Sequence, residues 1–445
     1  MPAPGPAAAP RAAVVRRAVA ATRAAGWPFG ARFFPLAAGC VAASVWLGTR
    51  AQLEWQALDW TYTSAEFTAQ LRFPAIVAAG AAAHVAARLT HRTRIFAQPW
   101  SVRVGHPLLR RHLGQLLGWF LPAYLLGMAP LVWATARHAS YGHPHALVVV
   151  GALTGLAALV ALGYLTGALV QNVLAVPLTV ALVFLLLGLP NLHDGWNAVV
   201  PTLSALPTLG REQSLDLGLY RLLAFTVFGA LFWSLAARLL TRRPPAAAHA
   251  PLLLVPVVLV ALPLLRTPAL FTYAGDGREV CDTRGTVTYC VHEGHRAELA
   301  ELRDLAAPVI AAYGPDRAPL RQVRDDALAG AGTGAHRPDT LWVPITPGWR
   351  PAEEVPPLVA STLLPGRAAC VSPTGSIAAG AATDERRTHL LQDLALWLQS
   401  RAFPGGGTDA GLFSGVAPER VRQWLARDRH AVETCTADPE DLPWR

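Results

Sequence analysis

The residues His292, Glu293 and His295 are the first candidates for chemistry in this chain. Zinc hydrolases of the H-E-x-x-H type carry two histidines four residues apart on one helix face, where both reach one metal and the Glu acts as base. Here the histidines are three apart, with Gly294 between them. We therefore interpret them as solvated residues that open a helix, with a membrane-bound metallohydrolase as the weakest functional alternative. We assign no catalytic residue, no metal ligand and no cofactor.

Other catalytic motifs are missing from the sequence. The chain contains no lysine, so it has no G-x-x-x-x-G-K-[ST] phosphate loop and cannot itself supply an ATPase of that type. No G-x-S-x-G nucleophile elbow occurs either. The sequence therefore predicts that this chain is not an enzyme.

Composition predicts a membrane protein instead. Hydrophobic residues make up 53% of the 445 residues, and they are concentrated before about residue 265. More than forty consecutive residues from Ala146 to Leu189 carry no charge, which is enough for two spans with a turn at Val170 to Val173. We expect a polytopic all-α bundle of six to seven transmembrane helices in residues 31–271. The predicted spans cover about 33–47, 73–89, 113–136, 146–169, 173–189, 219–240 and 252–271.

The distribution of charged residues predicts how these spans are oriented in the membrane. The net charge of +9 comes from arginines beside apolar segments, which points to membrane topology rather than to nucleic acid. The arginines gather in residues 1–30, 88–112 and 238–243, whereas the acids before Asp276 fall in the alternate loops. The positive-inside rule therefore predicts a basic, flexible cytoplasmic N-terminus and, after seven spans, an extracytoplasmic domain of residues 272–445 in the cell membrane. The last span contains prolines; if it does not cross, that domain is cytoplasmic.

The cysteines also indicate on which side of the membrane the C-terminal domain lies. Four of the five lie in the C-terminal domain, and an even set in an exported domain is typical of disulfides. Four cysteines allow three pairings. Because Cys281 and Cys290 flank an alternating segment centred on Gly285, we pair them with each other and Cys370 with Cys435. The alternative is four free thiols in a cytoplasmic tail.

The C-terminal domain is predicted to be a small α+β or mainly helical soluble domain. Apolar residues recur at helical spacing in 298–313, 384–401 and 418–434. Short apolar pieces in 340–372, broken by Pro and Gly, are candidates for strands.

Two stretches of the membrane region have features beyond hydrophobicity. The glycines Gly151, Gly155, Gly163 and Gly167 recur along one predicted span and form a seam for helix packing, within one chain or between two. The basic segment Thr90 to His112 mixes arginines with aromatic and apolar residues. It is either an interfacial segment on anionic lipid or a docking segment for a cytoplasmic partner.

The layout resembles the membrane subunits of actinobacterial ABC-2-type transporters. The resemblance rests on the segment IFAQPWSVRVGHPLLRRH (95–112), the run LVQNVLAVPL (169–178) and the loop 190–218. The span after residue 252 is followed by a domain that opens with Val280, Cys281 and Tyr289 to His292. Together they look like a variant of this family with an appended extracytoplasmic domain.

The resemblance implies a permease that couples a separate ABC ATPase to movement of an unidentified substrate, as a homodimer or heterodimer in the lipid bilayer. It implies substrate gating by Asn191 to Trp196 and a coupling loop. The implied coupling residues are Phe96, Trp100, Arg103, Arg110 and Arg111. A different class of function stays open: a membrane-anchored sensor or ligand-binding protein with an extracytoplasmic domain.

Overall fold

A computed structural model describes residues 32–55, 57–90, 102–139, 141–241, 250–273, 277–314, 318–329, 339–364, 381–404, 411–434 and 436–444. The chain forms two compact units. Unit 1 holds Met1–Glu54, Leu58–Pro207 and Glu212–Thr272, and unit 2 holds Trp55–Ala57, Thr208–Arg211 and Tyr273–Arg445. Two short segments from the N-terminal half of the chain thus belong to the C-terminal unit.

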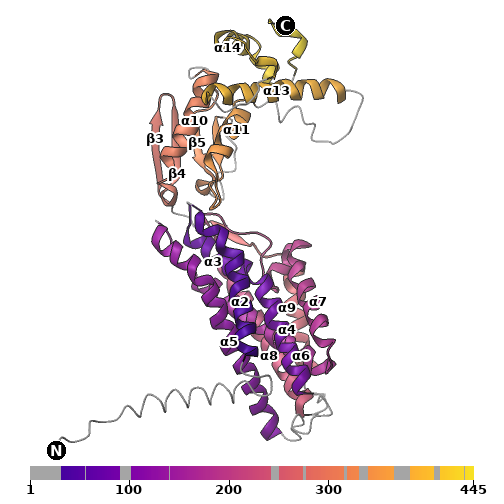
Figure 1. The fold of residues 1–445 in the computed structure, drawn as a ribbon. Helices are drawn as coiled ribbons and strands as arrows, with labels where there is room; N and C mark the ends of the chain where they lie inside the picture. The colour runs from indigo at the N-terminus through magenta and orange to yellow at the C-terminus, as the bar shows by residue number, and fades with distance from the viewer. Residues whose placement is uncertain are drawn as a thin grey trace, which may run out of the picture. The chain divides into compact units, whose positions relative to one another are not determined.

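Unit 1 is a bundle of apolar helices (Figure 1). Helix α4 packs against α2, α6 and α7, while α6 also packs against α8 and α2 against α5. The main helices are α2 (Phe33–Thr49), α3 (Trp60–Ala69), α4 (Arg72–Leu89), α5 (Val102–His138), α6 (Ala146–Val170), α7 (Ala175–Gly188), α8 (Leu215–Thr241) and α9 (Ala250–Leu265). Between α6 and α7 the chain turns at Gln171, which has a positive φ of 55°.

Four helices in the described part of the chain are long and apolar enough to cross a membrane, fewer than the six to seven predicted. They cover Phe33–Glu54, His106–His138, Ala146–Val170 and Leu215–Thr241. The other predicted spans are shorter or less apolar for local reasons. Helix α7 ends at Gly188 before a 3-10 turn (η3, Leu189–Asn191), α9 has 16 residues with two internal prolines, and α4 is rich in alanine with arginines near both ends.

The outside of unit 1 is apolar. Apart from Tyr273, every large hydrophobic side chain found exposed lies between Leu36 and Leu265. Helix α4, in contrast, is enclosed by its neighbours, and all of its alanines except Ala81 are buried. A helix surrounded by others needs small side chains more than lipid-like ones, which explains the low hydropathy of α4.

The polar stretch between the first two predicted spans is folded and mostly buried. It contains the 3-10 turn η1 (Arg50–Glu54) and the buried helix α3. Asp59 caps α3 by accepting a hydrogen bond from the Tyr62 backbone N–H at 2.7 Å. Glu66 is 1% exposed and accepts a bond from Gln70 at 2.7 Å, so the helix carries a buried carboxylate into unit 1.

Unit 2 is built on a four-stranded mixed sheet in the order β3-β4-β5-β6. Strands β3 (Glu279–Arg284) and β4 (Val287–His292) form an antiparallel hairpin, and β5 (Gln322–Asp325) and β6 (Thr340–Val343) continue it in parallel. A separate two-stranded sheet pairs β1 (Arg211–Gln213) with β2 (Phe271–Tyr273). The hairpin turn uses Gly285 at a φ of 65°, a conformation that glycine adopts without strain.

Helices complete unit 2. Helix α10 (Leu299–Tyr313) connects β4 to the parallel strand β5, and α10, α11 (Pro351–Leu363) and α13 (Ala381–Ala402) pack together around a shared apolar core. The chain then forms α14 (Pro418–Arg427) and α15 (Arg429–Glu433). The predicted mixed or helical domain is thus a mixed one. The single helix predicted for 418–434 is two, because the chain bends at Asp428, and α11 replaces part of a region expected to hold strands.

Candidate functional site

The segment between α7 and α8 is the most unusual part of unit 1, because it is irregular and yet largely buried. It runs through η3 and the 3-10 turn η4 (Asp194–Ala198) and then has no regular structure until β1. Proline and glycine residues prevent a continuous helix here. Buried residues of the segment include Gly195, Asn197, Ala198, Val199, Val200, Pro201, Thr202 and Leu203.

Asn197 holds this segment together. It is fully buried, and its amide nitrogen donates to the Asp194 carbonyl at 2.9 Å and to Ser204 Oγ at 3.0 Å. Its amide oxygen accepts the Ser204 backbone N–H at 2.7 Å. These bonds satisfy backbone and side-chain groups that no helix satisfies, as burial of irregular backbone requires.

Arg221 of α8 fixes the same segment from the side. Its side chain is 1% exposed, and Nη2 donates to the Pro201 carbonyl at 2.8 Å. The guanidinium also lies over the ring of Phe225, with Cζ 5.5 Å from the ring centroid. Within the described residues, Nη1 has no hydrogen-bond partner. A cation is thus held inside an apolar bundle beside irregular backbone.

The proposed gating residues form the outer part of this segment. Asn191, Leu192, His193 and Asp194 are exposed, and the chain turns inward at Gly195. A Cβ at Gly195 would collide with the Pro263 carbonyl of α9, so only glycine permits this close approach. The predicted residues therefore lead from the surface into the buried irregular segment.

The four glycines of the predicted seam face different neighbours. Gly163 and Gly167 lie against the backbone of α4 at Ala79 and Ala83, and Gly155 lies against Pro201 and Phe225. Gly151 has no atom within 4 Å of where its Cβ would stand. Three of these glycines therefore allow close packing inside one chain.

The predicted coupling residues lie at the start of α5 or before it. Phe96 and Trp100 are outside the described residues, and Arg103 is in the first turn of α5. Arg110 and Arg111 are exposed and, with His106 and Pro107, line a hollow of about 430 Å³. This end of α5 offers a basic, open surface.

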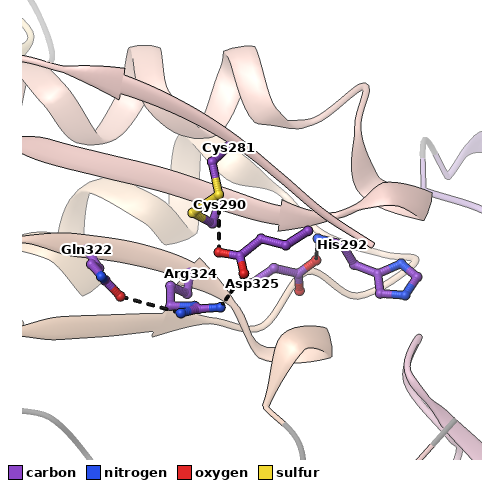
Figure 2. A network of polar contacts seen from close by, with 7 residues as sticks. Cys281, Cys290, His292, Gln322, Arg324 and Asp325 are labelled. Atoms are coloured by element: carbon purple, nitrogen blue, oxygen red, sulfur yellow. Dashed lines mark hydrogen bonds and ion pairs between the residues drawn. A yellow bond between two sulfur atoms is a disulfide. The ribbon is translucent and has the colours of Figure 1, made fainter. Parts of the chain in front are cut away.

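The first predicted disulfide is present. Cys281 and Cys290 are bonded and face each other in register on β3 and β4 (Figure 2). Cys370 and Cys435 lie outside the described residues. Cys40 of α2 is free and exposed.

The interpretation of His292 and His295 as solvated residues is wrong, because both are 2% exposed. Asp325, at the end of β5, accepts the His292 backbone N–H at 3.1 Å (Figure 2). It also contacts His295 Nδ1 at 2.6 Å. His292 Nδ1 accepts the Gly294 N–H at 3.1 Å. Burial is the main factor that lowers the pKa of His292. The histidines thus join β4 to β5 through a buried carboxylate.

Sequence reasoning did not find Arg221, Asn197 or Asp325. Arg221 could have been noticed as a charge two residues inside a predicted span, a position that favours function or buried pairing. Asn197 and Asp325 lie in polar contexts where nothing in the sequence separates a buried residue from an exposed one.

Comparison with known proteins gave no match to a family model, to a curated protein or to a solved structure.

Proposed function

We propose that the chain is the membrane-spanning permease subunit of an ABC-2-type transporter and works as a dimer with a separate ATPase. The observation that supports this most is the irregular and largely buried segment 190–207 within a bundle of apolar helices. Inside a bilayer, non-helical backbone is tolerated only where protein encloses it or where it lines a cavity. Transporters use such interruptions at their substrate sites. Asn191 to Trp196 would admit substrate, and Arg221 would hold the segment in place.

The proposed topology has seven crossings. Helix α4 has 18 residues, and α7 with η3 forms an apolar helix over Ala175–Asn191, lengths that lie near the lower limit for a span. Trp55–Ala57, Thr208–Arg211 and the tail belong to one compact unit, which favours one side of the membrane for all three. If α8 crosses, α9 must then cross back. The disulfide between Cys281 and Cys290 favours the extracytoplasmic side.

Thiol labelling tests this topology. Cys281 is exposed in unit 2, so a membrane-impermeant maleimide should label it in intact cells only after reduction, in a Cys40→Ala background. Labelling that requires opened cells would place the tail inside and remove one crossing.

The start of α5 is the proposed docking surface for the ATPase. Its arginines lie next to a membrane-spanning helix on the predicted cytoplasmic side, and Arg110 and Arg111 are exposed. A basic surface attracts an acidic partner and raises the rate of association. Arg137, at the other end of the same helix, is exposed too and lies over the Trp133 ring, with Cζ at 4.4 Å.

Charge reversal tests the docking. When the double variant Arg110→Glu, Arg111→Glu is purified, the amount of co-expressed ABC ATPase that copurifies should fall by about tenfold or more. The substituted glutamates would repel the acidic surface of the ATPase that the arginines attract. The matched control Arg137→Glu, some 40 Å away along α5, should retain it. Equal retention by both variants would overturn the docking role.

A further inference from the structure

Two hollows of unit 1 lie along a single face of α5. The first is the hollow of about 430 Å³ lined by His106, Pro107, Arg110 and Arg111. The second, of about 220 Å³, is bordered by Leu113 and Leu117. His106, Arg110, Leu113 and Leu117 are spaced by four, three and four residues, so they form one stripe on a helix of 3.6 residues per turn. The basic hollow and the apolar one therefore follow each other along the same face of α5.

The second hollow is a groove between α5, α6 and α8, and none of the described residues that line it is charged. Small residues open it, namely Ala157 and Ala161 of α6 and Gly229 and Ala230 of α8. On α6 the lining extends from Thr154 to Ala161, which corresponds to about 10 Å of helix. A hydrocarbon chain some 4–5 Å wide and 10 Å long fills roughly 150–200 Å³. The groove thus has room for about 10 Å of a single hydrocarbon chain.

A second helix fits this groove poorly. A helix with its side chains is about 10–12 Å across, so a segment 10 Å long occupies roughly 800 Å³ or more. The groove offers about 220 Å³. A single chain of lipid can therefore lie within the groove, whereas a helix could contact it with only one side.

The first hollow supplies the complementary chemistry. Arg110 and Arg111 are exposed at its edge, and guanidinium groups bind phosphate through paired N–H donors. Arg110 precedes Leu113 by three residues, about 4.5 Å of helix rise. A ligand that carries a phosphate a short linker away from a hydrocarbon chain matches this short distance.

We infer that this face of α5 binds one anionic phospholipid. The phosphate lies against His106, Arg110 and Arg111, and one acyl chain lies in the groove from Leu113 to Trp233. Anionic lipids gather at basic residues that border a membrane-spanning helix, which places such a ligand at this depth. The inference concerns a resident lipid and does not depend on the transport function.

Native mass spectrometry of the full chain in mild detergent, without any ATPase, tests the inference. Phosphatidylglycerol and phosphatidylcholine with identical chains are titrated separately. The first phosphatidylglycerol should bind about tenfold or more tightly than phosphatidylcholine, and Arg110→Gln with Arg111→Gln should remove that preference. The control Arg137→Gln should keep it. Equal binding of both lipids to the unaltered chain, or equal loss in both variants, would overturn the site.

Two further experiments test separately the binding of the acyl chain and of the phosphate. Ala157→Phe fills the groove from α6 and should weaken binding of both lipids several-fold; unchanged binding would exclude the groove. Glycerol 3-phosphate carries the head without the chain and should not displace phosphatidylglycerol at millimolar concentration. Displacement would assign the basic hollow to a free phosphate ester instead. ATPase retention is measured in a different assay, so either proposal can fail alone.

Discussion

Arg221 donates a hydrogen bond from Nη2 to the Pro201 carbonyl at 2.8 Å, and thereby connects a regular helix to the buried irregular segment beside it. Because the side chain is 1% exposed, the bond is shielded from water. Such a bond matters mainly through the cost of removing it, since the carbonyl is then buried without a donor.

Arg221→Ala should therefore lower the stability of the bundle by about 1–3 kcal/mol, with a further loss from the cavity. Thermal unfolding of the detergent-solubilised protein measures the change. Arg238→Ala, near the other end of α8, serves as the control. If both variants melt alike, Arg221 does not hold the segment.

Gly163 should not tolerate even one methyl group. A Cβ there would overlap the Ala79 carbonyl of α4, and backbone cannot move aside as a flexible side chain can. Gly163→Ala should destabilise the bundle by about 1–3 kcal/mol, although alanine favours helix. Gly151→Ala on the same helix meets no atom within 4 Å and should be neutral or slightly stabilising. Equal melting temperatures for the two variants would contradict this packing.

Asp325 should be the most sensitive polar residue of unit 2. It is fully buried and accepts from the His292 N–H, from the Ala327 N–H at 3.0 Å and, at 2.6 Å, from His295 Nδ1. Asp325→Ala should cost about 3–5 kcal/mol, because it leaves buried donors without an acceptor. Asp326→Ala removes only an exposed pair with Arg211 and should cost under about 1 kcal/mol. Protease resistance of unit 2 in urea measures both.

Glu298 should give unit 2 a defined pH dependence. Burial is the main cause that raises the pKa of Glu298 above its ordinary value of 4.5. The folded state therefore favours the protonated carboxyl, and this contribution to stability is complete below pH 4.5 and is lost as pH rises through the raised pKa.

Glu298→Gln removes the ionisable group, so it should stabilise unit 2 at pH 7.5 and have little effect at pH 4. His292 has the opposite dependence, because its lowered pKa costs stability as pH falls below 6.5. Because His292 is present in both proteins, its contribution cancels when the stability of the variant is compared with that of the unaltered protein at the same pH. A gain that is equal at both pH values would show that ionisation of Glu298 is not involved.

The local pattern of the sequence was enough for much of the fold. The uncharged stretch from Ala146 predicted two helices and a turn, and the structure has α6, α7 and the turn at Gln171. The alternation around Gly285 predicted the hairpin and its disulfide. These features depend on periodicity, charge and turn residues within a short window of the chain.

Long-range features could not be predicted in this way. The burial of Asn197 depends on its contact with Ser204 and on the helices around it, and Asp325 reaches His295 across 30 positions. Helix α3 was missed because its buried threonines and Glu66 resemble the composition of an exposed loop. In each case the sequence gives the polar residue, and only the packing decides whether water or protein surrounds it.

Purification of the unaltered chain from native membranes tests the central claim, that it is the permease of an ATP-driven transporter. Quantitative mass spectrometry of the purified material measures which proteins accompany it and in what ratio. The account predicts an ABC ATPase carrying the G-x-x-x-x-G-K-[ST] loop in near-stoichiometric amount. A chain that purifies in intact form without any such ATPase would contradict the account and leave a membrane-anchored sensor as the better explanation.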